Sequence, residues 1–286
     1  MKMAQCGVSL NVAEFVPFVP RSNRVSSCHV EGVSQKIADE LERGWLVPVP
    51  FYDLPHEFQW AVAPLQIVEE PTKLRLVTDY SYVQEGMKLG INGQVDVASL
   101  GEAYMHRCAD VAGAVHRLAR DGQTPVLLVR DLSKAFRRLG VEDADVPMLH
   151  TEWNGIHMWD TRLPFGHAAS AHAVCLLTRA IALEVTRRCR GSAECLCYVD
   201  DFVLVARPEF AEQAQFCLES LLRDLNLPVS EAKARESGAW STSVVWIGYS
   251  HDTVLRTHAV SPVKLQRLMG ELQMVQQHPE DVSVRF

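Results

Sequence analysis

The chain has 286 residues, of which 48% are hydrophobic and 22% charged, and its formal net charge is −7. This composition excludes bulk disorder, collagen-like repeats and low complexity, and it supports one large core or two or three closely associated subdomains. Because the longest apolar stretch, residues 168–185, contains His172, Arg179 and Glu184, no membrane-spanning segment is expected, and the protein is predicted to be soluble and intracellular.

The N-terminal half shows helical and strand patterns separated by Gly and Pro. Residues 1–30 show no apolar periodicity and are expected to form an irregular arm. Apolar residues at helical or strand spacing then predict, in chain order, a helix at 33–44, a β-hairpin from 61–68 and 74–77, and a helix at about 100–120. Gly122 is expected to end that last helix.

The C-terminal half begins with a continuous apolar run that is typical of a strand buried on both faces. The predicted elements are a strand at 125–129, a helix at 167–188, a hairpin from 194–198 and 202–206, a helix at 210–225, a strand at 244–248 and a helix at 263–276. Cys195 and Cys197 fall on one strand face and are interpreted as small core residues, since the eight cysteines contain no C-x-x-C pair. Mixed helices and antiparallel strands predict the α+β class.

Three carboxylates are candidates for chemistry. Asp200 and Asp201 occupy the turn of the 194–206 hairpin, where Asp is common for structural reasons alone. Asp131 follows the buried strand, and it meets Asp200 at one sheet edge if that strand pairs beside the hairpin. Mg²⁺ prefers such oxygen ligands, and two ions about 4 Å apart can promote phosphoryl transfer. The sequence therefore predicts a two-metal site, and Asp131 can also be interpreted as a helix N-cap.

Several segments resemble motifs of reverse transcriptases, and they occur in the order found in that family. The matching segments are the fingers motif at 73–80, the first palm motif Asp131-Leu132-Ser133-Lys134-Ala135-Phe136, the second palm motif Leu163-Pro164-Phe165-Gly166, the turn Tyr198-Val199-Asp200-Asp201, the fourth motif at 225–233, and a primer-grip-like Ile247-Gly248. The resemblance covers roughly residues 35–275.

The resemblance implies a right-hand polymerase, with palm and fingers, an antiparallel palm sheet backed by helices, and a partial thumb. The implied divisions are an N-terminal arm at 1–30, fingers at 31–104, the first part of the palm at 105–140, a connection at 141–161, the second part of the palm at 162–252, and the start of a truncated thumb at 253–286.

The resemblance also implies roles for particular residues. Asp131, Asp200 and Asp201 would hold two Mg²⁺, with Mn²⁺ as the alternative ion, and Lys233 would act as general acid. Phe136 would exclude the sugar 2′-hydroxyl and so favour deoxynucleotides. The nucleotide would contact Lys73, Arg75, Leu132, Phe136, Phe165 and Gly166. Taken alone, Phe136 is more readily interpreted as a core aromatic, and Lys73 and Arg75 as exposed charges on the outer face of a hairpin. Lys233 could be an ordinary solvated lysine.

Two departures from the family pattern keep a second hypothesis open. Ala168 and Ala171 replace the Ser and Pro that usually follow the second palm motif, which puts the helix start in doubt. Residues 68–71, Val-Glu-Glu-Pro, replace a V-P-K segment, so one expected cation is missing. The first hypothesis is an RNA-directed DNA polymerase that uses dNTPs and an RNA or DNA template with a primer. The second is an inactive or domesticated retroelement remnant that binds nucleic acid or a protein partner.

Other features bear on the kind of element. The L-P-F-G form leans toward tyrosine-recombinase or hepadnavirus-like elements, and RNase H, recombinase or integrase modules on a longer polyprotein are candidate partners. A nucleotide cyclase with a similar palm would explain neither the fingers motif nor Phe136. The negative net charge argues only weakly against nucleic-acid binding, because a groove needs only local positive potential.

Overall fold

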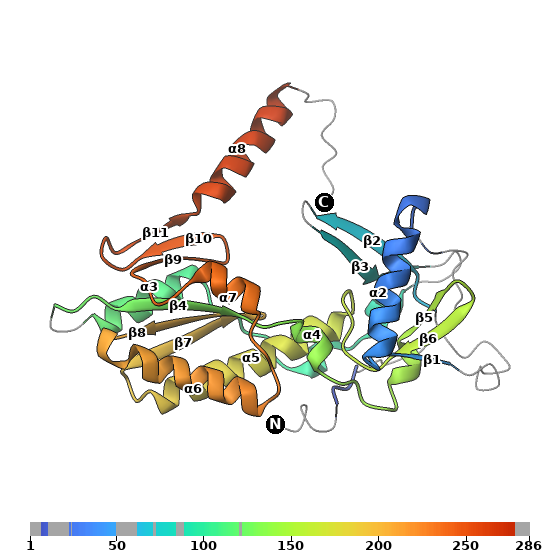
Figure 1. Ribbon diagram of the computed structural model, residues 1–286, viewed down its shortest axis with the longest axis horizontal. Coiled ribbons are helices and arrows are strands. Elements are labelled where there is room, and N and C mark those ends of the chain that lie inside the picture. The colour runs from blue at the N-terminus through green and yellow to red at the C-terminus, as the bar shows by residue number, and fades with distance from the viewer. Residues whose placement is uncertain are drawn as a thin grey trace. The chain divides into compact units, whose positions relative to one another are not determined.

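The computed structural model describes residues 7–10, 23, 25–49, 62–70, 73–83, 89–119 and 122–277 (Figure 1). The chain divides into two compact units. Unit 1 comprises residues 1–104 and 134–177, and unit 2 comprises residues 105–133 and 178–286. Both contain helices and antiparallel strands, so the predicted α+β class is confirmed.

Unit 1 contains one long helix, short helical turns and two small sheets. Its elements are α2 (Val30–Glu42), β1 (Leu46–Pro48), β2 (Leu65–Glu70), β3 (Lys73–Thr78), α4 (Ala135–Arg138), β5 (His150–Trp153) and β6 (Ile156–Asp160), with 3-10 turns at Ser27–His29, Ile91–Gln94, Val97–Leu100 and Val146–Met148. The strands form an antiparallel sheet in the order β1-β6-β5 and the separate hairpin β2-β3. Val33 and Ile37 of α2 pack against Leu65, Trp153 and Met158, which together form the core of this unit.

The hairpin β5-β6 was not predicted from the sequence. It turns at Asn154-Gly155, where φ is 52° and 78°. Two successive positive φ values define a type I′ turn, which Asn-Gly favours because its twist matches that of the flanking strands. The Asn-Gly pair was therefore a usable signal for this hairpin.

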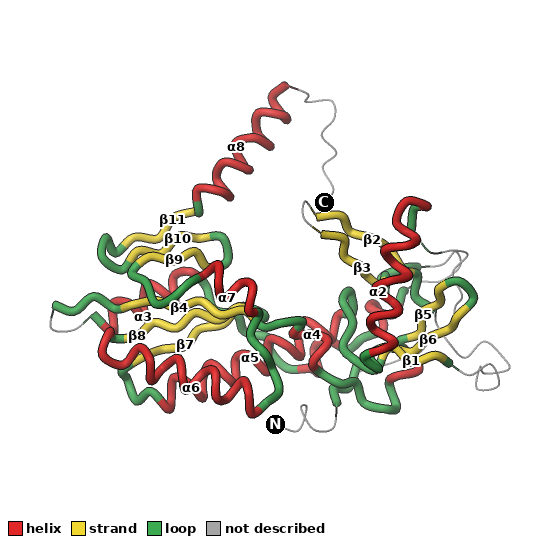
Figure 2. The backbone as a smooth tube through the Cα atoms, viewed as in Figure 1, coloured by secondary structure: helices red, strands yellow, loops and turns green. Residues whose placement is uncertain are grey.

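Unit 2 contains the predicted central hairpin. Its elements are α3 (Cys108–Leu118), β4 (Val126–Asp131), β7 (Ala193–Tyr198), β8 (Asp201–Ala206), α6 (Ala211–Asp224), α7 (Glu231–Ser237), β9 (Ser243–Trp246), β10 (Tyr249–Asp252), β11 (Thr257–Val260) and α8 (Pro262–Gln277). The antiparallel sheet β4-β8-β7 forms the centre, and β11-β10-β9 forms a second sheet (Figure 2). The helix α5 (Ala168–Arg188) begins in unit 1 and ends in unit 2.

The central sheet of unit 2 is covered on both faces. On one face, side chains of α3 and Trp246 pack against Leu127, Val203 and Val205. In Figure 1, α3 and the sheet β9–β11 lie on one side of this sheet, and α6 lies on the other. Burial on both faces explains why β4 and β8 are continuous apolar runs rather than alternating ones. Cys195 and Cys197 are buried in β7, as predicted.

One predicted boundary was wrong. The helix expected from about residue 100 begins instead at Cys108. Gly101 has a φ of 90°, which interrupts helical geometry, and the carboxylate of Asp110 accepts the N–H of Arg107 at 2.6 Å and so caps the helix there. The other predicted helices and strands are observed to within a few residues, apart from the turn at 71–72, which lies outside the described residues.

By length and composition, α5 could cross a membrane, and it is the one helix of the described residues that passes this test. Half of its most apolar segment is buried inside the protein. The hydroxyl of Thr186 also accepts the N–H of Cys195 at 2.8 Å, which attaches the helix to β7. These contacts are those of a helix packed into the core of the protein.

Candidate active site

The three predicted carboxylates meet at one end of the central sheet in unit 2. Asp131 is the last residue of β4 and pairs directly with Asp201, the first residue of β8. Directly opposed residues of an antiparallel pair point to the same face, so these two side chains lie together. One ligand oxygen from each of Asp131, Asp200 and Asp201 lies within 4.8 Å of the others. The predicted meeting of the strand end and the hairpin turn is therefore observed.

The turn that carries Asp200 has an unusual backbone. Tyr198 pairs with Asp201, so Val199 and Asp200 form a two-residue loop. Val199 has a φ of 52°, whereas Asp200 has no positive φ, which is the pattern of a type II′ turn. Glycine usually occupies that first position, because a β-branched residue there is strained. Such strain at a cluster of carboxylates is typical of functional sites.

Backbone hydrogen bonds join the end of β4 to two other segments, the turn at Asp200 and residues 228–230. The N–H of Leu132 donates to the carbonyl oxygen of Asp200 at 3.1 Å. The carbonyl oxygen of Asp131 accepts the N–H of Ser230 at 2.8 Å, and the N–H of Ser133 donates to Pro228 at 2.8 Å. The segment that leads into α7 is thus attached directly to the end of β4.

The side chain of Arg130 supports the same strand end from the opposite face. It is buried, and its Nε donates to Glu219 of α6 at 3.3 Å. Its Nη1 donates to the carbonyl oxygen of Gly238, just beyond α7, at 3.4 Å. Arg130 therefore links β4 to both helices that flank the strand end.

The carboxylate cluster is suited to a divalent cation. All three ligands are hard carboxylate oxygens, which Mg²⁺ and Mn²⁺ prefer. Asp131 is only 6% exposed, and a buried carboxylate beside two others is stabilised by a shared cation. A divalent metal therefore fits the residues of this site.

The aromatic residues predicted to contact a nucleotide lie together in unit 1. The rings of Phe136 and Phe165 have centroids 4.9 Å apart. Phe165 is 37% exposed, and with Arg75 it lines a pocket of about 280 Å³. The two aromatic residues are thus in direct contact, and their nucleotide-binding roles stay a prediction.

Gly166 is required by its surroundings. Its φ is 97°, and a Cβ at this position would overlap the carbonyl oxygen of Thr78 at the end of β3. Asn92 holds the same segment, because its amide nitrogen donates to the Gly166 carbonyl at 2.7 Å and its Oδ1 accepts the N–H of Ala168 at 2.8 Å. A side chain from a distant segment therefore caps α5, so the helix starts properly despite Ala168 and Ala171.

The remaining predicted residues are a buried leucine and two lysines. Leu132 is buried, at 4% exposure, and its N–H is used by Asp200. Lys73 lies in β3 and Lys233 in α7, but their side chains are outside the described residues. Sequence reasoning also missed three cations that line the pocket of Arg75, namely Lys36, Arg43 and Lys134.

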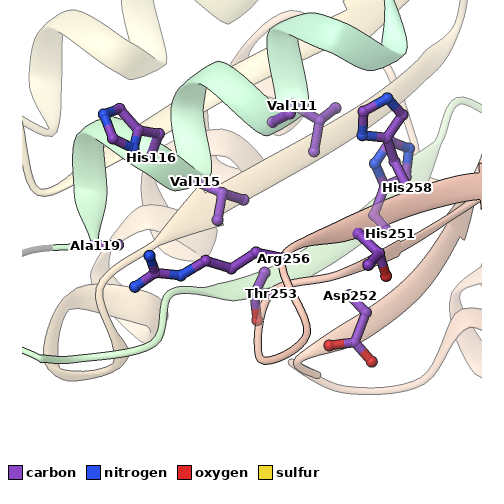
Figure 3. A pocket seen from close by; sticks show the side chains of 11 residues that line it. Val111, Val115, His116, Ala119, His251, Asp252, Thr253, Arg256 and His258 are labelled. Atoms are coloured by element: carbon purple, nitrogen blue, oxygen red, sulfur yellow. The ribbon is translucent and has the colours of Figure 1, made fainter.

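A second pocket, of about 210 Å³, lies in unit 2 between α3 and the strands β10 and β11 (Figure 3). Its lining includes His116, His251, His258 and Arg256. The imidazoles of His251 and His258 stack with centroids 6.3 Å apart. Burial and then the neighbouring His258 lower the pKa of His251 to about 4, so this histidine is neutral at neutral pH.

Solved structures show the class of fold. The chain is similar to a foamy viral protease-reverse transcriptase dRH in complex with double-stranded DNA, with a TM-score of 0.67 and 18% identity over 99% of this chain and 43% of that one. A foamy viral protease-reverse transcriptase in complex with an RNA/DNA hybrid gives 0.67 and 19% identity over 95% of this chain and 35% of that one. The fold is that of a reverse transcriptase polymerase, and this chain spans less than half the length of either protein.

The family follows from the sequence match. The family model for reverse transcriptase (RNA-dependent DNA polymerase) matches residues 67–251, which is more than half of the chain. The chain therefore belongs to the reverse transcriptase family, as its motifs predicted. No curated protein matches it. Its assignment to the tyrosine-recombinase type of retrotransposon stays a prediction.

Proposed function

We propose that this chain is a template-directed DNA polymerase that copies RNA, and that Asp131, Asp200 and Asp201 form its catalytic centre. The observation that supports this most is the carboxylate cluster, with ligand oxygens within 4.8 Å of one another at the end of β4. Membership of the reverse transcriptase family supports the same reaction.

The three aspartates would hold two Mg²⁺, with Mn²⁺ as the alternative. When bound, such ions supply Lewis-acid stabilisation of the attacking and leaving oxygens. The protein's own contribution is positioning. The strained Val199 turn and the hydrogen bond from Leu132 to the Asp200 carbonyl would keep the carboxylates in place before substrate arrives.

The proposed substrates are a dNTP and a primer annealed to an RNA or DNA template. The 3′-oxygen of the primer forms a bond to the α-phosphorus, and the bond from that phosphorus to the pyrophosphate oxygen breaks. The proton of the 3′-hydroxyl leaves to solvent, and Lys233 would donate a proton to the leaving pyrophosphate. Phe136, held against Phe165, would close the space beside the sugar 2′ carbon.

Lys73, Arg75, Leu132 and Gly166 would complete the nucleotide site. Arg75 supports this assignment best, because it lines the same pocket as Phe165 and a guanidinium binds phosphate oxygens in a forked geometry. We also propose that the protein works inside the cell, as a soluble domain that cooperates with RNase H, recombinase or integrase modules.

The test is extension of a labelled DNA primer on an RNA template with Mg²⁺ or Mn²⁺. The wild-type protein should add dNTPs, and Asp131→Asn should reduce the rate by about a thousandfold, because loss of a metal ligand removes several kcal/mol of transition-state stabilisation. Asp224→Asn, at the exposed end of α6, is the matched control and should extend primers at the wild-type rate.

Two outcomes would overturn the proposal. The first is folded wild-type protein that extends no primer with either metal, which would favour an inactive remnant. The second is Asp131→Asn protein that extends primers as fast as the wild type, which would place the chemistry elsewhere.

A further inference from the structure

The pocket that contains Arg75 carries an excess of positive charge. It lies wholly within unit 1 and has a volume of about 280 Å³. Two carboxylates, Asp39 and Glu40, line it. Its five lining cations are Lys36, Arg43, Arg75, Lys134 and Arg137.

The carboxylates do not neutralise all of these cations. Arg137 is buried and pairs with both Glu40 and Asp160. In contrast, Lys36, Arg43 and Lys134 form no ion pair within 4 Å in the described part of the chain. Lys36 is half-buried, and the other two are exposed at the pocket. Lys36, Arg43 and Lys134 thus line this small pocket without a carboxylate partner among the described residues.

The ring of Trp45 holds three of the pocket's cationic side chains close to one another. Its ring is buried, at 7% exposure, and three cations lie over it. The Nζ of Lys134 is 5.0 Å from the ring centroid, and the Cζ atoms of Arg43 and Arg137 are 5.3 and 5.5 Å away. Cation–π attraction holds like charges together that would otherwise separate.

The neighbouring positive charges affect the ammonium group of Lys134. Burial, and then the neighbouring Arg43 guanidinium, lower the pKa of Lys134. Its backbone is also in the left-handed region, with a φ of 55°, which is uncommon for a residue other than glycine. A cation held in this way among other cations is stabilised by a bound polyanion.

We propose that Lys134 and Arg43, assisted by Lys36, bind the triphosphate of the incoming nucleotide together with Arg75. This inference rests on the proposed polymerase function. These residues would supply the cation that is missing where Val68-Glu69-Glu70-Pro71 replaces the usual V-P-K segment. A triphosphate matches the site because it places several negative charges in a short chain, and Lys and Arg bind phosphate oxygens by charge-assisted hydrogen bonds.

The site also relates to the catalytic centre along the sequence. Lys134 follows the metal-binding candidate Asp131 by three residues, and Phe136 follows Lys134 by two. One short segment would therefore carry a metal ligand, a phosphate ligand and the sugar gate.

The first test measures single-turnover primer extension as a function of dNTP concentration. Lys134→Gln and Arg43→Gln should each raise the dissociation constant for dNTP about tenfold or more, as expected for loss of a charged hydrogen bond, and should change the maximal rate much less. The rise should be similar for all four dNTPs, because the phosphates are common to them. Lys134→Arg, which keeps the charge, should restore most of the affinity.

The matched control is Arg187→Gln, which removes an exposed cation near the end of α5. It should leave the dissociation constant for dNTP unchanged. Affinity for template-primer is measured for each variant with and without a single-stranded template overhang. If Lys134→Gln weakens binding of the overhang and leaves dNTP affinity intact, the pocket binds the template strand and the proposal is overturned.

The second test does not need catalysis. Calorimetry with inorganic tripolyphosphate should detect binding to the wild type and weaker binding to Lys134→Gln and Arg43→Gln. If the wild type extends no primer but shows this pattern, the anion site is supported and the polymerase function fails. If the wild type extends primers and the variants match it in both dNTP and tripolyphosphate binding, the anion site is wrong and the polymerase function stands.

Discussion

At the scale of single residues, Gly166 shows how closely the segment before α5 packs against the end of β3. Replacement by Ala would place a Cβ against the Thr78 carbonyl oxygen. Gly155 is the matched control, because its φ is also positive, at 78°, but no atom lies within 4 Å of its Cβ position.

We expect Gly166→Ala to lower the free energy of unfolding by about 2 kcal/mol or more, since it combines backbone strain with a clash that only backbone movement can relieve. Gly155→Ala should cost about 1 kcal/mol, from strain alone. Urea denaturation of the two variants measures the difference, and equal losses would show that the clash is absent.

Phe136 offers a test of sugar selection. Phe136→Ala should raise the rate of ribonucleotide incorporation relative to dNTP incorporation by about tenfold or more, because a steric exclusion worth a few kcal/mol disappears. The measurement is the ratio of kcat/KM for each dNTP and its rNTP. Phe136→Tyr keeps a ring of similar size and should retain the wild-type ratio. An unchanged ratio in Phe136→Ala would mean that Phe136 serves only the contact with Phe165.

At the scale of elements, the start of α5 depends on Asn92. Asn92→Ala removes both the cap on Ala168 and the donor to the Gly166 carbonyl, and it should lower the free energy of unfolding by about 1–2 kcal/mol. Asn92→Asp keeps the oxygen that accepts the N–H of Ala168 but loses the donor to the Gly166 carbonyl. Its free energy of unfolding should therefore fall by less than that of Asn92→Ala. Thermal denaturation distinguishes the two, and identical midpoints for Asn92→Ala and the wild type would contradict the cap.

Elements with a clear period were predictable from the sequence, and others were not. The apolar run at 125–129 and the hairpin at 194–206 identify the central sheet, because burial on both faces leaves no polar alternation. The strand β11 has four exposed residues and no apolar face, so its pattern carries no strand signal. The hairpin β5-β6 carries a sequence signal of a different kind, the turn pair Asn154-Gly155.

The candidate site was predictable to a similar extent. Asp131 ends the apolar strand β4, and Asp200 lies in the turn that joins β7 to β8. Their meeting therefore follows from the pairing of these strands. Arg43 and Lys134 could not be assigned, because they meet over the ring of Trp45 through the tertiary fold, and a contact of this kind leaves no spacing in the sequence.

At the scale of the whole molecule, buried histidines make stability depend on pH in both units. Burial lowers the pKa of His150 to about 3 and that of His167 to about 4 in unit 1, and His251 of unit 2 is lowered to about 4. All three are at most 3% exposed. Their folded-state pKa values lie below the unfolded value of about 6.5, so the unfolded chain binds more protons as the pH falls below that value.

The protein should therefore lose stability as the pH falls from 6.5 towards 4, by about 1 kcal/mol per pH unit for each histidine. Urea denaturation between pH 7.5 and 5 measures the slope. His251→Gln should reduce that slope, whatever its effect at pH 7.5, because one titrating group has been removed. A variant with the wild-type slope would show that His251 is already protonated or exposed in the folded protein.

The order of the two units along the chain has a consequence for synthesis. Their residues alternate as 1–104, 105–133, 134–177 and 178–286. A chain emerging from the ribosome has released Asp131 long before Asp200, and unit 1 lacks part of its core until residue 177 is made. Each unit therefore can fold completely only after a segment of the other unit has been synthesised. The nascent chain keeps apolar surface exposed for longer than a chain with consecutive domains does. It should therefore depend more on chaperones during translation.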